Sequence, residues 1–427
     1  MTARRRLLWM LACAALAVLV AGAATVRWLN HLDEAPLPAQ GTAPSTDPAV
    51  VERGAYLARV GNCIACHSAP GGAPLAGALA VQTPFGAIYS SNLTPDADTG
   101  LGLWTAEEFW RALHNGRSRD GRLLYPAFPY TSFTQLTRED SDALFAFLRS
   151  VPAVRQAPPA HELAFPANSQ GALALWRALY FRPGSPPHEE AQPPQWNRGA
   201  YLVRAVAHCA ACHTPRNALG GLRGSADLTG AWLPGGRWYA PSLVDPAEAS
   251  LAAWPPEEAA ALLASGVSRH GSVSGPMAEV VFTGLQYLDA GDLDAMVGYL
   301  RALEQRPARK APVHAAPPAV LERGREVYAQ HCAQCHGRQG EGRGGFVALA
   351  GRRAVTLEHA DNLVQMLVHG GYAPATRGNP RPHGMPPFAQ QLSDADMAAV
   401  LSYIRSAWGN QASAVNAMDI HRARERR

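Results

Sequence analysis

The sequence lacks a basic stripe, although its formal net charge is +4. Arg4, Arg5, Arg6 and Arg27 lie in the first thirty residues, and residues 410–427 add further positive charge, so the remaining body is slightly negative. Proteins that bind nucleic acid gather lysine and arginine on one face. We therefore expect no nucleic-acid partner.

Catalytic constellations are also missing. No nucleophile–base pair and no acid–base dyad stands out, so the sequence predicts no catalytic residue and no substrate oxidation by this chain alone.

Methionine is scarce, with eight copies in 427 residues. Because a domain usually takes about 100–200 residues, a chain of this length predicts two to four packed units.

The N-terminus carries an apolar run from Leu7 to Val26, preceded by three arginines and followed by Arg27. This pattern is typical of an export signal, and twenty residues are also long enough to span a bilayer. Residues 21–23 (Ala-Gly-Ala) offer a cleavage site, so residues 1–30 are either a signal peptide or a membrane anchor. In both cases the body lies on the periplasmic side of the inner membrane.

Six of the seven cysteines form three pairs, and each pair is followed by histidine. Cys-x-x-Cys-His is the attachment motif of c-type haem, with two thiols for the haem vinyl groups and a histidine for the iron. A structural zinc site would need a second ligand pair nearby, and none follows any copy. The sequence therefore predicts three covalent haem c groups. The motifs are Cys63, Cys66 and His67, then Cys209, Cys212 and His213, then Cys332, Cys335 and His336.

The surroundings of the motifs repeat, which predicts repeated domains. Each motif follows an amphipathic segment opening with Arg-Gly, and each is followed by a middle helix ending in glycine and a closing helix beginning at a leucine. The Arg-Gly pairs are at 53–54, 198–199 and 323–324, the middle helices at 105–116, 255–266 and 359–370, and the leucines at 136, 288 and 392. The predicted fold is all-α, with three tandem cytochrome c-like domains.

The expected boundaries follow the Pro-rich stretches 152–159, 183–194 and 307–318, which we interpret as semi-stiff spacers. One apolar helix, 172–181, interrupts the first linker, and we favour interdomain packing for it over contact with a membrane surface or a partner. The expected segments are domain 1 at 45–152, a linker at 153–194, domain 2 at 195–305, a linker at 306–319, domain 3 at 320–409 and a charged tail at 410–427.

The second axial ligand of an electron-transfer haem is usually methionine. Met277 and Met385 each follow a middle helix in an irregular loop, so we assign them to the second and third irons, with His270 and His383 as rivals. The corresponding place in the first unit holds Phe128, which has no donor atom. The first iron is therefore open, or it is bound by another residue such as His114 or His161. Carbonyl groups near Pro70 and Pro215 are expected to orient His67 and His213.

Several segments beyond the haem motifs resemble the three-haem cytochrome c subunit of bacterial membrane-bound alcohol, gluconate and aldehyde dehydrogenases. They are residues 53–57 (Arg-Gly-Ala-Tyr-Leu), 89–96 (Tyr-Ser-Ser-Asn-Leu-Thr-Pro-Asp), 124–127 (Leu-Tyr-Pro-Ala), 196–202 (Trp-Asn-Arg-Gly-Ala-Tyr-Leu) and 407–410 (Ala-Trp-Gly-Asn). The resemblance covers residues 50–410. It implies a catalytic dehydrogenase partner with pyrroloquinoline quinone, flavin, or molybdenum and iron–sulfur clusters, and ubiquinone or another respiratory acceptor. Phe128 departs from the pattern of many relatives and favours a molybdenum-type partner.

The leading hypothesis is a periplasmic electron relay, the non-catalytic electron-transfer subunit of an oxidoreductase complex. One alternative is peroxidase-like or quinone-reducing activity at an open first haem. Another is a cytochrome subunit of a terminal oxidase.

Overall fold

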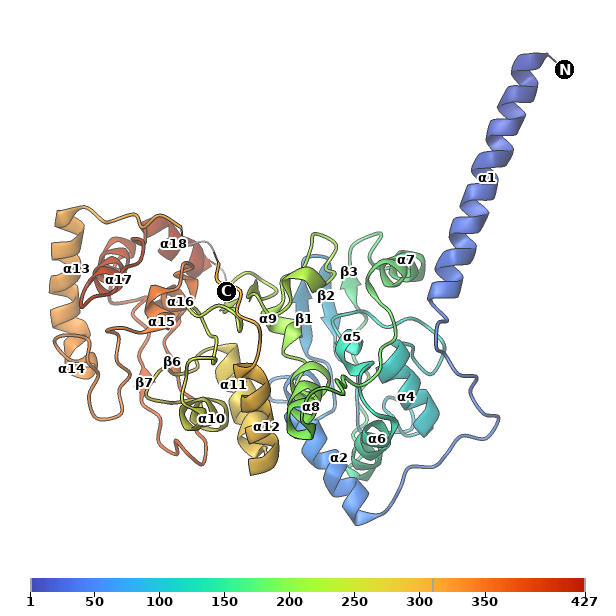
Figure 1. The fold of residues 1–427 in the computed structure, drawn as a ribbon, viewed down its shortest axis with the longest axis horizontal. Coiled ribbons are helices and arrows are strands. Elements are labelled where there is room, and N and C mark those ends of the chain that lie inside the picture. Colours follow the sequence, from blue (N-terminus) through green and yellow to red (C-terminus); the bar gives the residue numbers. More distant parts are fainter. Residues whose placement is uncertain (1, 309–310, 426–427) are drawn as a thin grey trace.

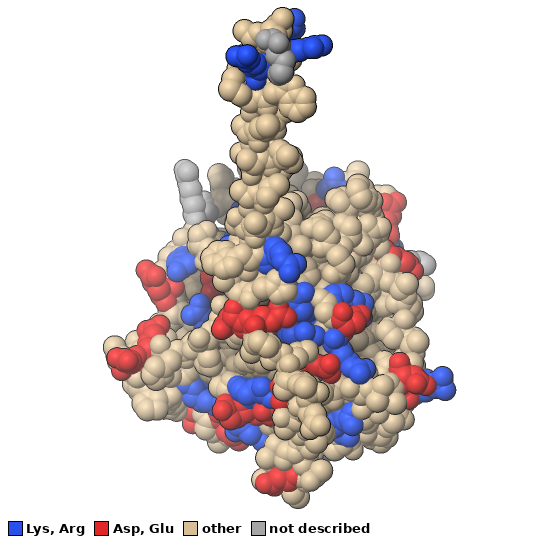
Figure 2. All heavy atoms as spheres, turned by 90° about the vertical axis from the view of Figure 1, so that its right-hand side faces the viewer, with Lys and Arg blue, Asp and Glu red and all other residues tan. Residues whose placement is uncertain are grey.

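The computed structural model describes residues 2–308 and 311–425. One long helix, α1 (Ala3–Leu29), stands clear of the body, and none of its residues is buried. Figure 2 shows its far end covered by the arginines near the N-terminus. Along the described residues, α1 is the one helix long and apolar enough to cross a membrane.

The body is mostly helical and consists of three similar units that follow one another from right to left in Figure 1. The first contains α2 (Pro48–Val60), α3 (Cys63–Cys66), α4 (Ala106–Asn115), α5 (Tyr130–Phe133) and α6 (Arg138–Ser150). The second contains α8 (Pro194–Tyr201), η1 (Leu202–Val206), α9 (Ala210–His213), η2 (Gly224–Ala226), α10 (Pro256–Ser265), α11 (Pro276–Thr283), η3 (Leu285–Tyr287) and α12 (Ala290–Arg301). The third contains α13 (Pro318–His331), α14 (Ala333–His336), α15 (Arg353–Thr356), α16 (Asp361–His369), α17 (Asp394–Ser406) and α18 (Ala417–Glu425).

The Arg-Gly pair explains how the first and last helices of each unit cross. A Cβ atom on Gly54 would lie 1.9 Å from the Ala143 carbonyl oxygen of α6, and in the other units the corresponding distances are 2.0 Å and 2.2 Å. Only a residue without a side chain permits this approach. The pair lies inside α2, α8 and α13, so the expectation that it opens the helix is wrong.

The arginine of each pair binds an aspartate of the closing helix. Arg53 Nε lies 2.6 Å from Asp140, and Arg198 Nε lies 2.7 Å from Asp292. Each aspartate also donates its backbone N–H to the side chain that caps its helix, namely Thr137, Asp289 and Ser393. The third unit repeats the ion pair with Arg323 and Asp396 at 2.8 Å.

The closing helices begin two residues after the leucines that the sequence pattern predicted as their first residues.

Short strands accompany the helices, so the all-α prediction is incomplete. In the first unit β1, β2 and β3 form an antiparallel sheet in that order, with Ala80 opposite Tyr89 and Gly86 opposite Leu163. Each of the other units has one two-stranded ladder. The strands are β1 (Ala80–Thr83), β2 (Gly86–Tyr89), β3 (Glu162–Leu163), β4 (Ala231–Trp232), β5 (Tyr239–Ala240), β6 (Gly371–Tyr372) and β7 (Gly384–Met385).

The first two units share one hydrophobic core, whereas the third unit has its own. Leu57 and Phe145 of the first unit belong to the same buried cluster as Val203 and Leu300 of the second. The Pro-rich stretches between these units therefore do not hold them apart as spacers.

Of two other predicted segments, the C-terminal tail differs from its prediction and the apolar helix of the first linker agrees with it. The expected charged tail contains α18, which lies against α16 and α17 with Ile420 fully buried. The predicted apolar helix is α7 (Gln170–Tyr180). It does make the expected interdomain contact, because Trp176 Nε1 donates a hydrogen bond of 2.8 Å to the carbonyl of Leu219 in the second unit.

Candidate haem sites

The three Cys-x-x-Cys-His motifs have the same local geometry. Each forms a single helical turn, in α3, α9 and α14, and in each the histidine N–H donates to the carbonyl of the first cysteine at 2.9 Å. Cysteines three residues apart lie on one face of such a turn. Both thiols and the histidine can therefore bind the same planar ligand.

The histidine rings are oriented by backbone carbonyls that the sequence did not identify. His67 Nδ1 lies 2.7 Å from the Ser91 carbonyl, His213 Nδ1 lies 2.7 Å from that of Pro241, and His336 Nδ1 lies 2.8 Å from that of Val347. The expectation of carbonyls near Pro70 and Pro215 is wrong. Since Nδ1 donates to oxygen, the proton is fixed there and Nε2 keeps its lone pair for a metal.

Burial favours the neutral form of five motif thiols and two motif histidines. It raises the pKa of the Cys63, Cys209 and Cys332 thiols to about 12 and also raises the pKa of Cys66 and Cys212. It lowers the pKa of His67 and His213, which favours the neutral imidazole. Protonated thiols and neutral imidazoles suit thioether formation and iron coordination.

The donor set fits haem better than a bare metal ion. Across residues 2–308 and 311–425, His, Cys, Asp and Glu nowhere gather in a group of three or more that could hold a metal ion. A haem iron needs fewer protein ligands than a bare metal ion, because the porphyrin supplies four ligands and the chain supplies one or two. Each motif provides one such histidine and two thiols.

The predicted distal methionines lie on regular elements rather than in irregular loops. Met277 is in the first turn of α11 and packs against the shared core, and Met385 is in β7 and packs against the core of the third unit. Phe128 packs against the shared core, with its ring centroid 6.3 Å from Tyr130 and 5.5 Å from Phe133. Phe128 therefore belongs to an aromatic cluster of the first unit.

The histidines named as other ligands have different surroundings. His114 stacks on Trp110 and lies 3.4 Å from Asp33, so it belongs to the junction with α1. His161 Nδ1 accepts a hydrogen bond of 3.2 Å from the Tyr89 N–H, and its ring meets Tyr125 edge-on.

The histidines considered as alternative iron ligands in the second and third units also contact other residues. His270 lies over Trp254, with ring centroids 5.0 Å apart. His383 stacks on Phe346 and approaches the Gly344 carbonyl at 3.1 Å.

The first and second motifs lie close together in space. Burial raises the pKa of Cys66 and the charge of a Cys212 thiolate would raise it further, as expected for groups that lie near each other. His208, directly before the second motif, approaches the Gly61 carbonyl at 3.2 Å, and its ring meets Phe133. A reciprocal contact joins Thr283 to Asn62, directly before the first motif, at 2.5 Å.

Two tyrosines cross this junction in opposite directions, and the sequence pattern carried no signal for their partners. Tyr56 OH donates to Asp292 Oδ2 of the second unit, and Tyr201 OH donates to Asp140 Oδ2 of the first, each at 2.7 Å. Each tyrosine therefore reinforces the Arg–Asp pair of the other unit. The two units pack with an approximate two-fold relation between equivalent residues.

The third unit is attached to the second by other residues. The Asn362 side chain of α16 accepts from the Tyr239 N–H at 2.9 Å and donates to the Tyr239 carbonyl at 2.8 Å. Tyr239 lies two residues before Pro241, whose carbonyl orients His213. His359 packs between Trp232 and Tyr239 at this contact.

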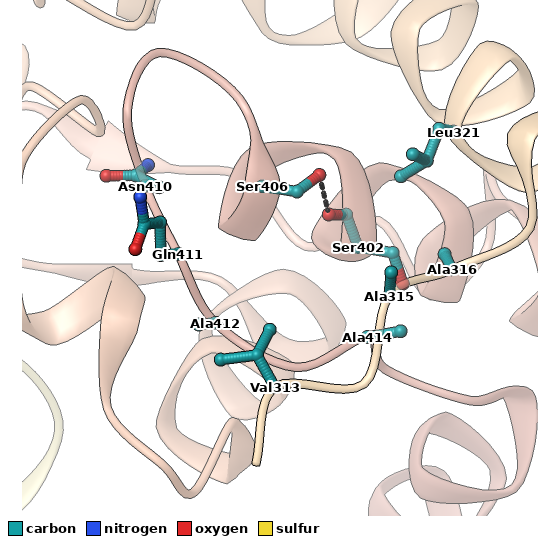
Figure 3. A pocket seen from close by; sticks show the side chains of 10 residues that line it. All are labelled: Val313, Ala315, Ala316, Leu321, Ser402, Ser406, Asn410, Gln411, Ala412 and Ala414. Atoms are coloured by element: carbon teal, nitrogen blue, oxygen red, sulfur yellow. Dashed lines mark hydrogen bonds between the residues drawn. The ribbon is translucent and has the colours of Figure 1, made fainter. Parts of the chain in front are cut away.

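A cavity of about 300 Å³ lies at the third unit, between residues 313–316 and the end of α17 (Figure 3). Small apolar side chains such as Ala315 and Ala412 line it, together with Ser402 and Ser406. Its lining contains no cysteine, histidine or methionine, so it is separate from the three motifs.

Comparisons with known proteins agree with this geometry. The model of the cytochrome c family matches residues 51–152 and 321–408. The chain is 36% identical over 405 residues to the cytochrome c subunit of an alcohol dehydrogenase (quinone) from Gluconacetobacter polyoxogenes, covering 90% of this chain and 86% of that protein. It is 35% identical to the cytochrome c subunit of gluconate 2-dehydrogenase from Pantoea cypripedii, covering 87% and 89%.

A longer relative is a subunit of nicotinate dehydrogenase from Pseudomonas putida, with 40% identity over 379 residues. The match covers 85% of this chain but 31% of that protein. The chain therefore spans about a third of this relative.

Proposed function

Because the chain belongs to the family of cytochrome c subunits of membrane-bound dehydrogenases, we propose that it carries three haem c groups and relays electrons from a catalytic subunit to ubiquinone or another respiratory acceptor. The observation that carries this proposal is the threefold repetition of one motif geometry, with a histidine fixed through Nδ1 in each copy. When bound, haem supplies reversible one-electron redox chemistry.

The residues of the chain bind and orient these groups. The three cysteine pairs form the thioether links, and His67, His213 and His336 coordinate iron from one side. Met277 and Met385 are the proposed ligands on the other side of the second and third irons. Each unit is then a cytochrome c domain, and the shared core between the first two keeps their motifs at a fixed separation.

We place the body on the periplasmic side of the inner membrane. The length and composition of α1 fit a membrane anchor or an export signal, and the arginines before it favour a cytoplasmic N-terminus. The residues that follow α1 bind the body, since Arg117 Nε contacts Glu34 at 3.1 Å and Arg177 Nε contacts Asn30 at 2.8 Å.

The proposed partner is a dehydrogenase of the molybdenum type. Phe128 in place of a methionine supports it, because the resemblance links that departure to molybdenum-type partners. The 40% identity to a subunit of nicotinate dehydrogenase supports a partner that oxidises an N-heterocycle. Partners with pyrroloquinoline quinone or flavin are the other candidates, because relatives belong to alcohol and gluconate dehydrogenases.

A mass and haem measurement on the purified full-length chain tests the proposal. We expect three covalently attached porphyrins, and two after His213 and its cysteine pair are replaced together. Free thiols at the motifs of the wild type would refute it. Co-purification with a dehydrogenase subunit supports the relay, whereas co-purification with an oxidase core would support the terminal-oxidase alternative.

Phe128 motivates one second candidate, a ligand-binding first haem with peroxidase-like activity. Carbon monoxide binding by one of three ferrous haems, together with peroxide turnover, would favour it. A spectrum unchanged by carbon monoxide would exclude it.

A further inference from the structure

The end of α1 is held against α7. Asn30, directly after α1, is 7% exposed. Its side chain donates to the Ala174 carbonyl of α7 at 2.9 Å and accepts from Arg177 Nε at 2.8 Å. Arg177 is 2% exposed, so this contact is part of the folded body. Any bilayer that α1 crosses must therefore end within about one helical turn of α7.

The outer face of α7 is apolar and exposed. The inner face packs on the body through Leu173 and Ala178. Leu175 and Leu179, four residues apart on one face, are 52% and 58% exposed. Phe165, before α7, is 85% exposed. Exposed apolar side chains on neighbouring segments are typical of an interaction surface.

The second unit extends the same surface. Leu219 is 53% exposed and is fixed to α7 by the hydrogen bond from Trp176 Nε1 to its carbonyl. Nearby, Gly221 lies against the ring of Tyr180, where a Cβ atom would come within 2.6 Å of the ring. Tryptophan and tyrosine at the edge of an apolar surface are typical of the boundary between lipid and water.

The two segments that form this surface carry no negative charge, although Glu162 and Asp227 directly flank them. Residues 163–187 and 213–226, which include α7 and the loop beside it, contain no aspartate or glutamate. They contain the exposed Arg182, Arg216 and Arg223. Exposed arginines around an apolar centre fit a surface of anionic phospholipid headgroups.

We propose that α7 and the loop 216–222 form a second membrane contact, in which Leu175, Leu179, Phe165 and Leu219 enter the outer edge of an anionic bilayer. This proposal rests on the proposed anchoring by α1. The attachment of α7 to Asn30 places the surface at the correct depth, and the loop couples the second unit to the same plane. The body is then held in one orientation, which a single helix could not impose.

Thiol accessibility tests the proposal in the full-length, haem-loaded chain. In a Cys13→Ala background, whose other cysteines are thioether-linked, Leu175→Cys and Leu179→Cys are compared with Leu103→Cys. Leu103 is 57% exposed and directly follows Gly102, whose carbonyl accepts a hydrogen bond from Arg149 of α6. In Figure 1, α6 lies at the lower edge of the first unit and α7 at its upper edge. The three positions should therefore react alike in water.

The proteins are placed, without any other subunit, in vesicles of phosphatidylethanolamine and phosphatidylglycerol at 3:1, a ratio on the order used for inner-membrane mimics. We expect a charged maleimide to alkylate positions 175 and 179 at least about tenfold more slowly than position 103, since both sites leave water. A lipid-soluble maleimide should reverse this order.

Equal rates with the charged reagent would overturn the second contact while leaving the anchor intact. Slow reaction with both reagents would mean that protein covers the face, which also overturns it. Failure of the chain to float with the vesicles would refute the anchor and the second contact together.

Discussion

Tyr56 and Tyr201 each donate a hydrogen bond across the junction of the first two units. Replacing each of them with phenylalanine measures its separate contribution to the free energy of unfolding. Arg53 contacts only Oδ1 of Asp140, so Tyr201 is the single side-chain donor to Oδ2 of a carboxylate that is 1% exposed. In the other direction, Arg198 binds both oxygens of Asp292, and Tyr56 adds a second donor to an oxygen that already has one.

The expected costs therefore differ. A hydrogen bond to a charged group contributes about 1.5–3 kcal/mol, and a buried acceptor left without any donor loses most. Tyr201→Phe should lower the free energy of unfolding by about 3 kcal/mol, and Tyr56→Phe by about 1.5 kcal/mol. The two sites are linked through Arg198, which lies over the Tyr201 ring and binds Asp292, so the loss in the double variant should differ from the sum of the single losses.

Guanidinium unfolding followed by far-ultraviolet circular dichroism measures these losses, and the first two units should unfold together because they share a core. Tyr372→Phe is the matched control, since Tyr372 is 70% exposed and should change stability by less than about 0.5 kcal/mol. An equal or larger loss for Tyr56→Phe, or control-sized losses at both positions, would refute the reasoning.

Three further predictions concern packing, pH and coordination. Gly199→Ala on α8 should destabilise the chain by about 1–3 kcal/mol through overpacking against α12. Gly298→Ala, on α12 itself, should stabilise the chain by up to about 1 kcal/mol, because its Cβ would meet nothing within 4 Å. Burial raises the pKa of Asp292, but bonds from Arg198 and Tyr56 outweigh it and lower the pKa overall. The stability from Asp292 should therefore be complete above about pH 4 and fall as the pH drops through the lowered pKa, with a shallower fall in Tyr56→Phe. Phe128→Met should raise the reduction potential of the first haem in a potentiometric titration; an unchanged potential would mean that residue 128 does not face the iron.

Local patterns in the sequence predicted the parts of the fold that depend on neighbouring residues. The haem motifs occupy single turns, and the middle helices end where glycine permits a left-handed conformation, as at Gly116 and Gly266 with φ of 59° and 78°. The Arg-Gly pair was recognised as a repeat, but its role in close helix crossing needed the closing helix in place.

Contacts between distant segments could not be predicted in the same way. The carbonyls that orient His67 and His213 come from residues 24 and 28 positions away, and that of His336 from 11 positions away, so no fixed spacing identifies them. The Tyr56–Asp292 contact spans 236 residues and forms only when two folded units dock. The prediction of a charged tail was incomplete because charged residues dominate its composition, and the apolar face of α18 that buries Ile420 is short.

One position in the repeat distinguishes the two paired units from the third. The residue three after the Arg-Gly arginine is Tyr56 in the first unit, Tyr201 in the second and Glu326 in the third. A tyrosine can donate to an aspartate of another unit, whereas a glutamate would bring a second negative charge to it. Glu326 instead lies 3.7 Å from the arginine of its own unit, Arg323, which is 57% exposed. The third unit takes no part in this exchange and attaches to the second through other contacts, including those of Asn362 with Tyr239, of Arg353 with the Ser250 carbonyl and of Thr376 with the Ser265 carbonyl.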